Sequence, residues 1–273
     1  MRSMTREQVV ARYAEGFGQG EGRDYRPWLQ AHDVPSQGVT FRMNGRTTGR
    51  QHVLFSTIER NGFLAAQWLD NVVDIREQFP LWPLEATEAV AEELAVNHPI
   101  HPKGGVVLMT TDLLLTTRDG GMEAIAIKPA DKLCETRVLE KLEVERVYWK
   151  SLGVPWSIVT ERELPEAFVA NLVWLNDYYE ITPETIAPDQ LPRLETYLFD
   201  KLTSTTNVPL NRVCADADDS LGQTPGTCLG VFRHALARKR WHLPLDQRIV
   251  PAAPLSIAPE LVWAEDKYSN RAA

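Results

Sequence analysis

Hydrophobic positions between residues 106 and 128 follow the pattern of two strands joined by a tight turn. Residues 106–117 are rich in leucine and β-branched side chains, which favour extended structure. An Asp-Gly-Gly turn follows at 119–121, and glycine supplies the positive φ that a hairpin turn requires. A second apolar run covers 122–128 and ends at Pro129, which lacks an amide donor. The pattern predicts a central β-hairpin.

The rest of the first 165 residues shows a periodicity that predicts helices packed against a mixed sheet, an α/β fold. Apolar side chains recur at helical spacing in some segments and form short extended runs in others. The charged side chains of the helix expected over 131–152, Glu145 among them, are assigned to a solvated surface rich in ion pairs. The predicted helices cover residues 6–15, 56–70, 85–95 and 131–152, and the predicted strands cover 72–77 and 154–160.

After residue 165 the pattern becomes mainly helical. A glycine-containing turn at 220–224 joins the last two predicted helices with the spacing of a helix-turn-helix. Residues 241–245 and 248–250 fit a small hairpin, the wing of a winged helix. An ordinary helical subdomain explains the pattern equally well, because cations suit the end of a helix. The predicted helices cover 166–176, 192–202, 209–218 and 226–240.

We therefore expect two domains. The first covers residues 1–165 and includes an N-terminal arm over 1–50, and the second covers 166–273.

Composition narrows the class of protein. A hydrophobic content of 44% and a charged content of 24% over 273 residues are typical of a soluble globular protein. The net charge of −8 argues against a uniformly basic nucleic-acid-binding protein but allows local basic patches. Three cysteines without CxxC spacing predict neither a zinc site nor a disulfide framework. Because no signal-like N-terminus and no long apolar stretch is found, we expect a cytoplasmic protein without a membrane segment.

Two basic segments are candidates for contacting DNA phosphates. The first lies within residues 23–50, and the second ends the helix predicted over 226–240. A solvated surface explains the same residues equally well. The candidates are Arg42, Arg46, Arg50, Arg233, Arg238, Lys239 and Arg240.

Three residues could carry chemistry. Asp112 lies inside an apolar strand, where a carboxylate is costly to bury unless a cation meets it. Lys128 ends the partner strand, and Glu59 lies at the start of the helix over 56–70. Two carboxylates and a backbone carbonyl, that of Ile127, suit Mg²⁺, and an ammonium beside them suits phosphodiester hydrolysis. Taken singly, Glu59 is explained as a helix cap, Asp112 as a hydrogen-bond acceptor and Lys128 as a solvated strand end.

Longer stretches of the chain resemble the TnsA family, the endonuclease subunits of heteromeric Tns-type transposases. The resemblance covers roughly residues 16–178. Matches over several continuous stretches are more specific than a single three-letter motif. The similar stretches are residues 18–29, 72–81, 111–112, 126–130, 139–143, 154–156 and 171–175.

The resemblance implies a restriction-endonuclease-like catalytic domain followed by a winged-helix-like domain. Glu59, Asp112 and Lys128 match that family's acidic and lysine active-site residues, with Mg²⁺ as the cofactor and Mn²⁺ as its substitute. It also implies hydrolysis of the 5′-side strand at transposon ends in cut-and-paste transposition. A TnsB-type transposase subunit would cut and join the 3′ ends, and a TnsC-type AAA+ ATPase would be the partner of the C-terminal region. Such systems include CRISPR-associated transposons.

The family usually has a glutamine two residues before the lysine, where this chain has Ala126. That difference removes one polar contact to metal-bound water or DNA. It leaves open a second interpretation, an adaptor with a nuclease fold that links DNA, transposase and ATPase. A stand-alone restriction or repair nuclease, a third interpretation, would use the same three residues.

Overall fold

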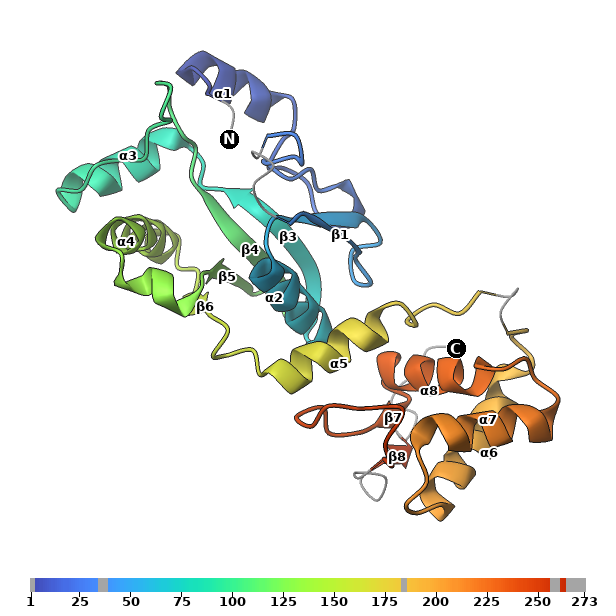
Figure 1. Ribbon diagram of the computed structural model, residues 1–273. Helices are drawn as coiled ribbons and strands as arrows, with labels where there is room; N and C mark the ends of the chain where they lie inside the picture. The colour runs from blue at the N-terminus through green and yellow to red at the C-terminus, as the bar shows by residue number, and fades with distance from the viewer. Residues whose placement is uncertain (1–2, 34–38, 183–185, 256–260, 264–273) are drawn as a thin grey trace. The chain divides into compact units, whose positions relative to one another are not determined.

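The computed structural model describes residues 3–33, 39–182, 186–255 and 261–263, and the chain divides into two compact units. Unit 1 is Met1–Leu164 and unit 2 is Pro165–Ala273 (Figure 1). Within the described residues, no helix combines the length and the apolar character needed to cross a membrane.

A four-stranded mixed sheet forms the centre of unit 1, in the order β3-β4-β5-β6. β3 (Val72–Pro80) and β4 (Thr110–Thr117) are antiparallel, and β5 (Met122–Ile127) is antiparallel to β4. β6 (Trp156–Val159) is parallel to β5. The predicted hairpin is confirmed as β4–β5, although its first strand begins at Thr110 rather than at residue 106.

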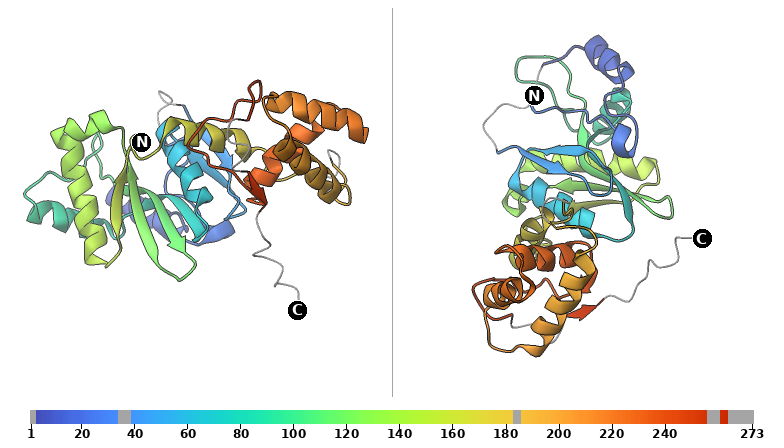
Figure 2. Two further views of the ribbon diagram at one scale, coloured as in Figure 1. Left: turned by 90° about the horizontal axis from the view of Figure 1, so that it is seen from below. Right: turned by 90° about the vertical axis from the view of Figure 1, so that its right-hand side faces the viewer.

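Helices cover both faces of this sheet (Figure 2). α2 (Thr57–Trp68) packs its Phe63 against a face that includes Leu113. α3 (Leu84–Glu93) and α4 (Thr136–Ser151) pack against the opposite face, where Trp149 meets Leu114. The predicted mixed sheet flanked by helices is therefore confirmed.

The predicted helix over 131–152 is interrupted. Ala130–Cys134 forms a short 3-10 helix, and α4 begins only at Thr136, because Glu135 between them has an extended backbone. The amide of Ala130 donates to the carboxylate of Glu161, which anchors the short helix to the loop after β6.

The N-terminal part contains α1 (Arg6–Ala14) and a hairpin that the hydrophobic pattern did not reveal. β1 (Phe41–Asn44) and β2 (Gln51–Leu54) have only four residues each, too few for a clear alternation. Tertiary contacts stabilise them instead: Arg50, just before β2, forms an ion pair with Glu77 of β3.

Unit 2 contains the four predicted helices, so the predicted helical C-terminal region is confirmed. The turn between the last two is held by Asp218, whose carboxylate accepts hydrogen bonds from the amides of Gly226 and Cys228 at the start of the last helix. The helices are α5 (Glu166–Asn176), α6 (Leu191–Ser204), α7 (Leu210–Leu221) and α8 (Thr227–Ala237).

The predicted wing hairpin is wrong. β7 (Trp241–His242) pairs with β8 (Val262–Trp263) rather than with residues 248–250. The side chain of Asn171 in α5 accepts from the amide of Ile249 and donates to the carbonyls of Leu245 and Gln247. These bonds use the backbone groups that a hairpin over 241–250 would need.

Candidate active site

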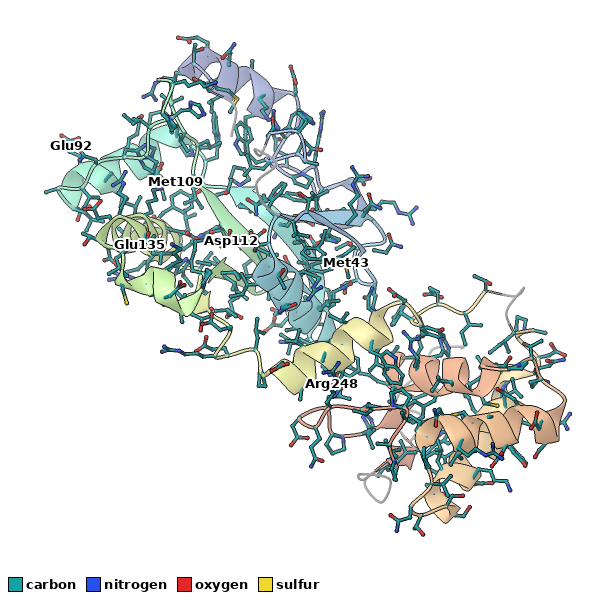
Figure 3. All side chains as sticks on the ribbon, viewed as in Figure 1. Met43, Glu92, Met109, Asp112, Glu135 and Arg248 are labelled. Carbon is teal, nitrogen blue, oxygen red and sulfur yellow. The ribbon has the colours of Figure 1, made fainter. Side chains whose placement is uncertain are left out.

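Asp112 lies near the start of β4 (Figure 3). At this position the side chains of β4 and of its neighbour β3 change the face of the sheet towards which they point. On β4, Leu113 packs on the α2 side, whereas Thr111 donates a hydrogen bond to Glu145 of α4. On β3, Ile75 packs on the α2 side and Phe79 on the α4 side, although residues an even number apart normally share a face. The change of face gives Asp112 a polar setting within an apolar strand.

The carboxylate of Asp112 completes the end of the β4–β5 ladder. Regular pairing ends at Leu113 and Ile125, and beyond it Asp112 Oδ2 accepts from the amide of Ile127 at 2.6 Å. The same oxygen accepts from Lys128 Nζ at 2.6 Å, and that ammonium also donates to the carbonyl of Ile127 at 3.0 Å. Asp112 and Lys128 are therefore brought together.

The ammonium of Lys128 stays charged. Burial acts to lower the pKa of Lys128, but the charge and hydrogen bond of Asp112 outweigh it and leave that pKa above its usual value. The side chain remains 34% exposed, against 12% for Asp112. Lys128 thus presents a cation that a substrate can still approach.

Glu59 comes from the first turn of α2. Its Oε1 accepts from the hydroxyl of Ser56, and its Oε2 accepts from the amide of Phe55. Burial, and next the negative charge of Asp112, raise the pKa of Glu59. The carboxylate therefore caps its helix and also lies within the electric field of Asp112.

Glu145 is a further acid that the sequence interpretation placed wrongly on a solvated surface. It is 5% exposed, and its Oε1 accepts from Thr111 Oγ1 at 2.5 Å and from Trp156 Nε1 at 3.1 Å. Burial, with the nearby charge of Asp112, raises the pKa of Glu145 to about 7. Its spacing from the buried Leu142 and Trp149 is the helical signal that could have revealed it.

The donor set fits a hard divalent cation. Glu59 and Asp112 are like charges in a partly buried place, and Asp112 Oδ1 accepts none of the hydrogen bonds formed by the described residues. Those residues contain no group of three or more His, Cys, Asp or Glu side chains placed to share an ion. Mg²⁺ is usually bound by one or two protein carboxylates and takes its other ligands from water and substrate oxygens. Two carboxylates and the carbonyl of Ile127 match this pattern.

Comparison with known proteins identifies the family. Residues 69–161 match the N-terminal domain of TnsA-like endonucleases, and residues 163–245 match the TnsA endonuclease C-terminal domain. The transposition protein TnsA of transposon Tn7 from Escherichia coli is 41% identical over 194 residues, which is 70% of this chain and 69% of that protein. The chain belongs to the TnsA endonuclease family. The predicted family and the predicted activity, that of an endonuclease subunit of Tn7-like transposition, are confirmed.

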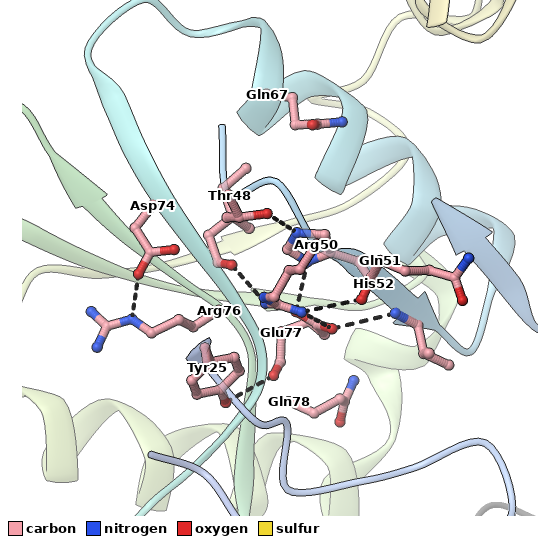
Figure 4. Close-up of polar contacts among 12 residues, drawn as sticks. Tyr25, Thr48, Arg50, Gln51, His52, Gln67, Asp74, Arg76, Glu77 and Gln78 are labelled. Carbon is pink, nitrogen blue, oxygen red and sulfur yellow. Dashed lines mark hydrogen bonds and ion pairs between the residues drawn. The ribbon is translucent and has the colours of Figure 1, made fainter. Parts of the chain in front are cut away.

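In this TnsA-family chain, Arg50 is enclosed by protein groups, whereas a DNA-binding residue is expected to be exposed. Its guanidinium forms an ion pair with Glu77 and donates to the carbonyls of Gly22 and Ile75, with 8% of its side chain exposed (Figure 4). A cation held on all sides cannot reach a phosphate. By contrast, Arg42 is exposed on β1, and Arg46 is half-buried in the following turn.

The basic residues of unit 2 also divide into two groups. Arg233 is half-buried, stacks on Tyr178 and donates to the carbonyl of Trp174, so its guanidinium is already engaged within unit 2. Arg240 is half-buried and forms an ion pair with Glu195. Arg238 is exposed and lies over Tyr179, and its neighbour Lys239 follows the end of α8. Arg238, which pairs with Glu180 at 3.4 Å but stays exposed, remains a candidate for a surface contact, beside the half-buried Lys239.

Proposed function

We propose that this TnsA-family endonuclease hydrolyses the 5′-side strand at transposon ends, as one subunit of a cut-and-paste transposase. The observation that carries the proposal is the meeting of Asp112 with Lys128 at the end of the β4–β5 ladder, within the field of Glu59. The mixed sheet with helices on both faces supports a restriction-endonuclease-like catalytic domain over residues 1–165.

Glu59, Asp112 and the carbonyl of Ile127 would hold Mg²⁺, with Mn²⁺ as its substitute. When bound, the cation supplies a water of lowered pKa and polarises the scissile phosphate. Lys128, held by Asp112 at 2.6 Å, orients the attacking water and offsets negative charge that develops on the phosphate. Glu59 and Asp112 must both be ionised to serve as ligands, so binding of the cation strengthens as pH rises through the raised pKa of Glu59.

DNA and protein partners complete the proposal. Arg42 and Arg238, which are exposed, are proposed to contact phosphates, together with the half-buried Arg46 and Lys239. Residues 166–273 are proposed as the region that binds DNA and partners, among them a TnsC-type AAA+ ATPase. A TnsB-type transposase subunit would process the 3′ ends. The proposed compartment is the bacterial cytoplasm.

The test is cleavage of transposon-end DNA with Mg²⁺ and the partner transposase present. We expect Asp112→Ala to lower the rate of 5′-side cleavage by about 10³-fold, as for the loss of a preorganised catalytic group. Asp131→Ala, at an exposed aspartate of the same domain, is the matched control and should cleave normally. An Asp112→Ala protein that cleaves at the normal rate would overturn the proposal.

Ala126 favours one alternative, an adaptor that binds DNA and partners without cutting. Ala126 is fully buried next to Ile125, the last residue of β5 paired with β4, so no polar side chain reaches the site from that position. An adaptor predicts unchanged transposition products with Asp112→Ala. A stand-alone nuclease predicts instead that the isolated chain cuts DNA, and the assay without partners distinguishes it.

A further inference from the structure

Gln78 has an unusual backbone at the place where β3 and β4 change faces. Its φ is 49°, in the left-handed region that non-glycine residues rarely adopt, and its side chain is almost completely buried. Glu77 pairs with Leu113 and Phe79 pairs with Thr111, so the register puts Gln78 directly opposite Asp112. Backbone strain of this kind persists where the surrounding structure demands it, often at functional sites.

The side-chain amide of Gln78 joins two elements of the candidate site. Its Nε2 donates to Glu59 Oε2 at 3.4 Å, and its Oε1 accepts from Thr110 Oγ1 at 3.3 Å. An ionised carboxylate only accepts hydrogen bonds, so the NH₂ end of the amide must face Glu59. Within the part of the chain that the structure describes, the other donors to the Glu59 carboxylate are Phe55 and Ser56, at the start of its own helix.

The cross-strand neighbours of Asp112 therefore differ. On the β5 side the next residue beyond the paired Ile125 is Ala126, which has no polar side chain. On the β3 side Gln78 supplies an amide and connects the sheet to α2 through Glu59. Gln78 therefore connects Thr110 of β4 to Glu59, the second carboxylate of the candidate site.

We propose that Gln78 is a positioning residue, which sets the orientation of the Glu59 carboxylate relative to Asp112 for binding of a divalent cation. This inference rests on the proposed function. The left-handed backbone at residue 78 turns the side chain towards Glu59, and the hydroxyl of Thr110 holds the amide in place. Mutation of a residue that hydrogen-bonds to a metal ligand typically lowers metal affinity by 10- to 100-fold.

The experiment measures Mn²⁺ affinity of the full chain by isothermal titration or electron paramagnetic resonance, together with the melting temperature. Gln78→Gly removes the amide but adopts a positive φ without strain. Gln78→Ala removes the same amide and retains the strain. We expect both variants to bind Mn²⁺ about tenfold more weakly, and Gln78→Gly to melt at a higher temperature than Gln78→Ala because glycine relieves the backbone strain.

A purely structural role for Gln78 predicts that Gln78→Gly binds Mn²⁺ with normal affinity, which would overturn the inference. Thr110→Val, which keeps Gln78 but removes the hydroxyl that holds it, should weaken Mn²⁺ binding to a smaller extent; normal affinity in this variant would also count against it. Asp112→Asn separates the two proposals. If Asp112→Asn binds Mn²⁺ normally, the proposed function fails; if it does not bind and Gln78→Gly does, only the role of Gln78 fails.

Discussion

Two carboxylates of unit 1, the buried Glu77 and the half-buried Glu59, meet opposite electrostatic conditions. Glu77 is completely buried and bonds to the guanidinium of Arg50 and to His52 Nδ1. Burial acts to raise the pKa of Glu77, but these hydrogen bonds and charges lower that pKa to about 2. Among the described residues none forms an ion pair with Glu59, and burial, with the charge of Asp112, raises the pKa of Glu59.

The difference separates a structural ion pair from a site that can accept a ligand. The network of Glu77 is complete: His52 Nδ1 must donate to the carboxylate, which leaves Nε2 to accept from Thr48 Oγ1 (Figure 4). It fastens the β1–β2 hairpin to β3. Around Glu59 and Asp112 negative charge exceeds positive charge, and an added cation would be stabilised there.

The largest effect is expected from Glu77→Ala. The substitution leaves the guanidinium of Arg50 buried without its counter-charge, so the free energy of unfolding should fall by about 3–5 kcal/mol. Urea denaturation at pH 7 measures it. Asp112→Ala is the control, because its lysine partner is partly exposed and returns to water. A loss below about 1 kcal/mol for Glu77→Ala would contradict the structural role.

The Glu77 network also predicts an acid limit. Since the folded-state pKa of Glu77 lies below its usual value, the stability it contributes is complete above pH 4.5 and is lost as pH falls towards 2. Glu77→Gln should remove that part of the acid dependence, as followed by denaturation at pH 3 and pH 6.

Glu145 should show the opposite dependence on pH. Its folded-state pKa of about 7 exceeds the usual 4.5, so ionisation costs stability as pH rises from 4.5 to 7. Glu145→Gln resembles the neutral acid and can keep its bonds to Thr111 and Trp156. In metal-free buffer at pH 8 the variant should be more stable than the parent by about 3 kcal/mol, with little difference at pH 4.5. If Glu145→Gln and the parent protein were equally stable at pH 8 as well as at pH 4.5, the raised pKa of Glu145 would be contradicted.

Asp112→Asn should lower the pKa of Glu59 in the metal-free protein, because it removes a neighbouring like charge. Carbon-13 titration of the glutamate carboxylates by NMR measures this pKa. The pKa of Glu77, held chiefly by Arg50 and His52, serves as the internal reference. If the pKa of Glu59 is the same in Asp112→Asn as in the parent protein, the two carboxylates do not share a site.

The smallest effect belongs to an exposed pair on α4. Arg146 and Glu143 meet at 2.6 Å, but both side chains are more than 40% exposed. Arg146→Ala should change the free energy of unfolding by about 0.5 kcal/mol or less, measured by the same urea titration. A loss as large as that of Glu77→Ala would mean that burial does not distinguish these pairs.

Local patterns in the chain predicted the β4–β5 hairpin, the mixed sheet and the four helices of unit 2, because hydrophobic period and turn residues act over a few positions. Residue type also singled out Asp112 and Lys128, since a carboxylate in an apolar strand requires a partner. The β1–β2 hairpin, the buried Arg50 and the pairing of Trp241 with Trp263 depend on residues distant in the chain. No local pattern contains those partners.

The sequence by itself determined the α/β layout, the family and the three residues proposed for chemistry. Only the tertiary structure decided which charges are enclosed and which are left open to a ligand. It put Arg50 against Glu77, turned Glu145 inwards and placed Gln78 across from Asp112. The physical reason is that the pKa and reach of a charged group depend on burial and on nearby charges, which chain folding brings together from distant positions.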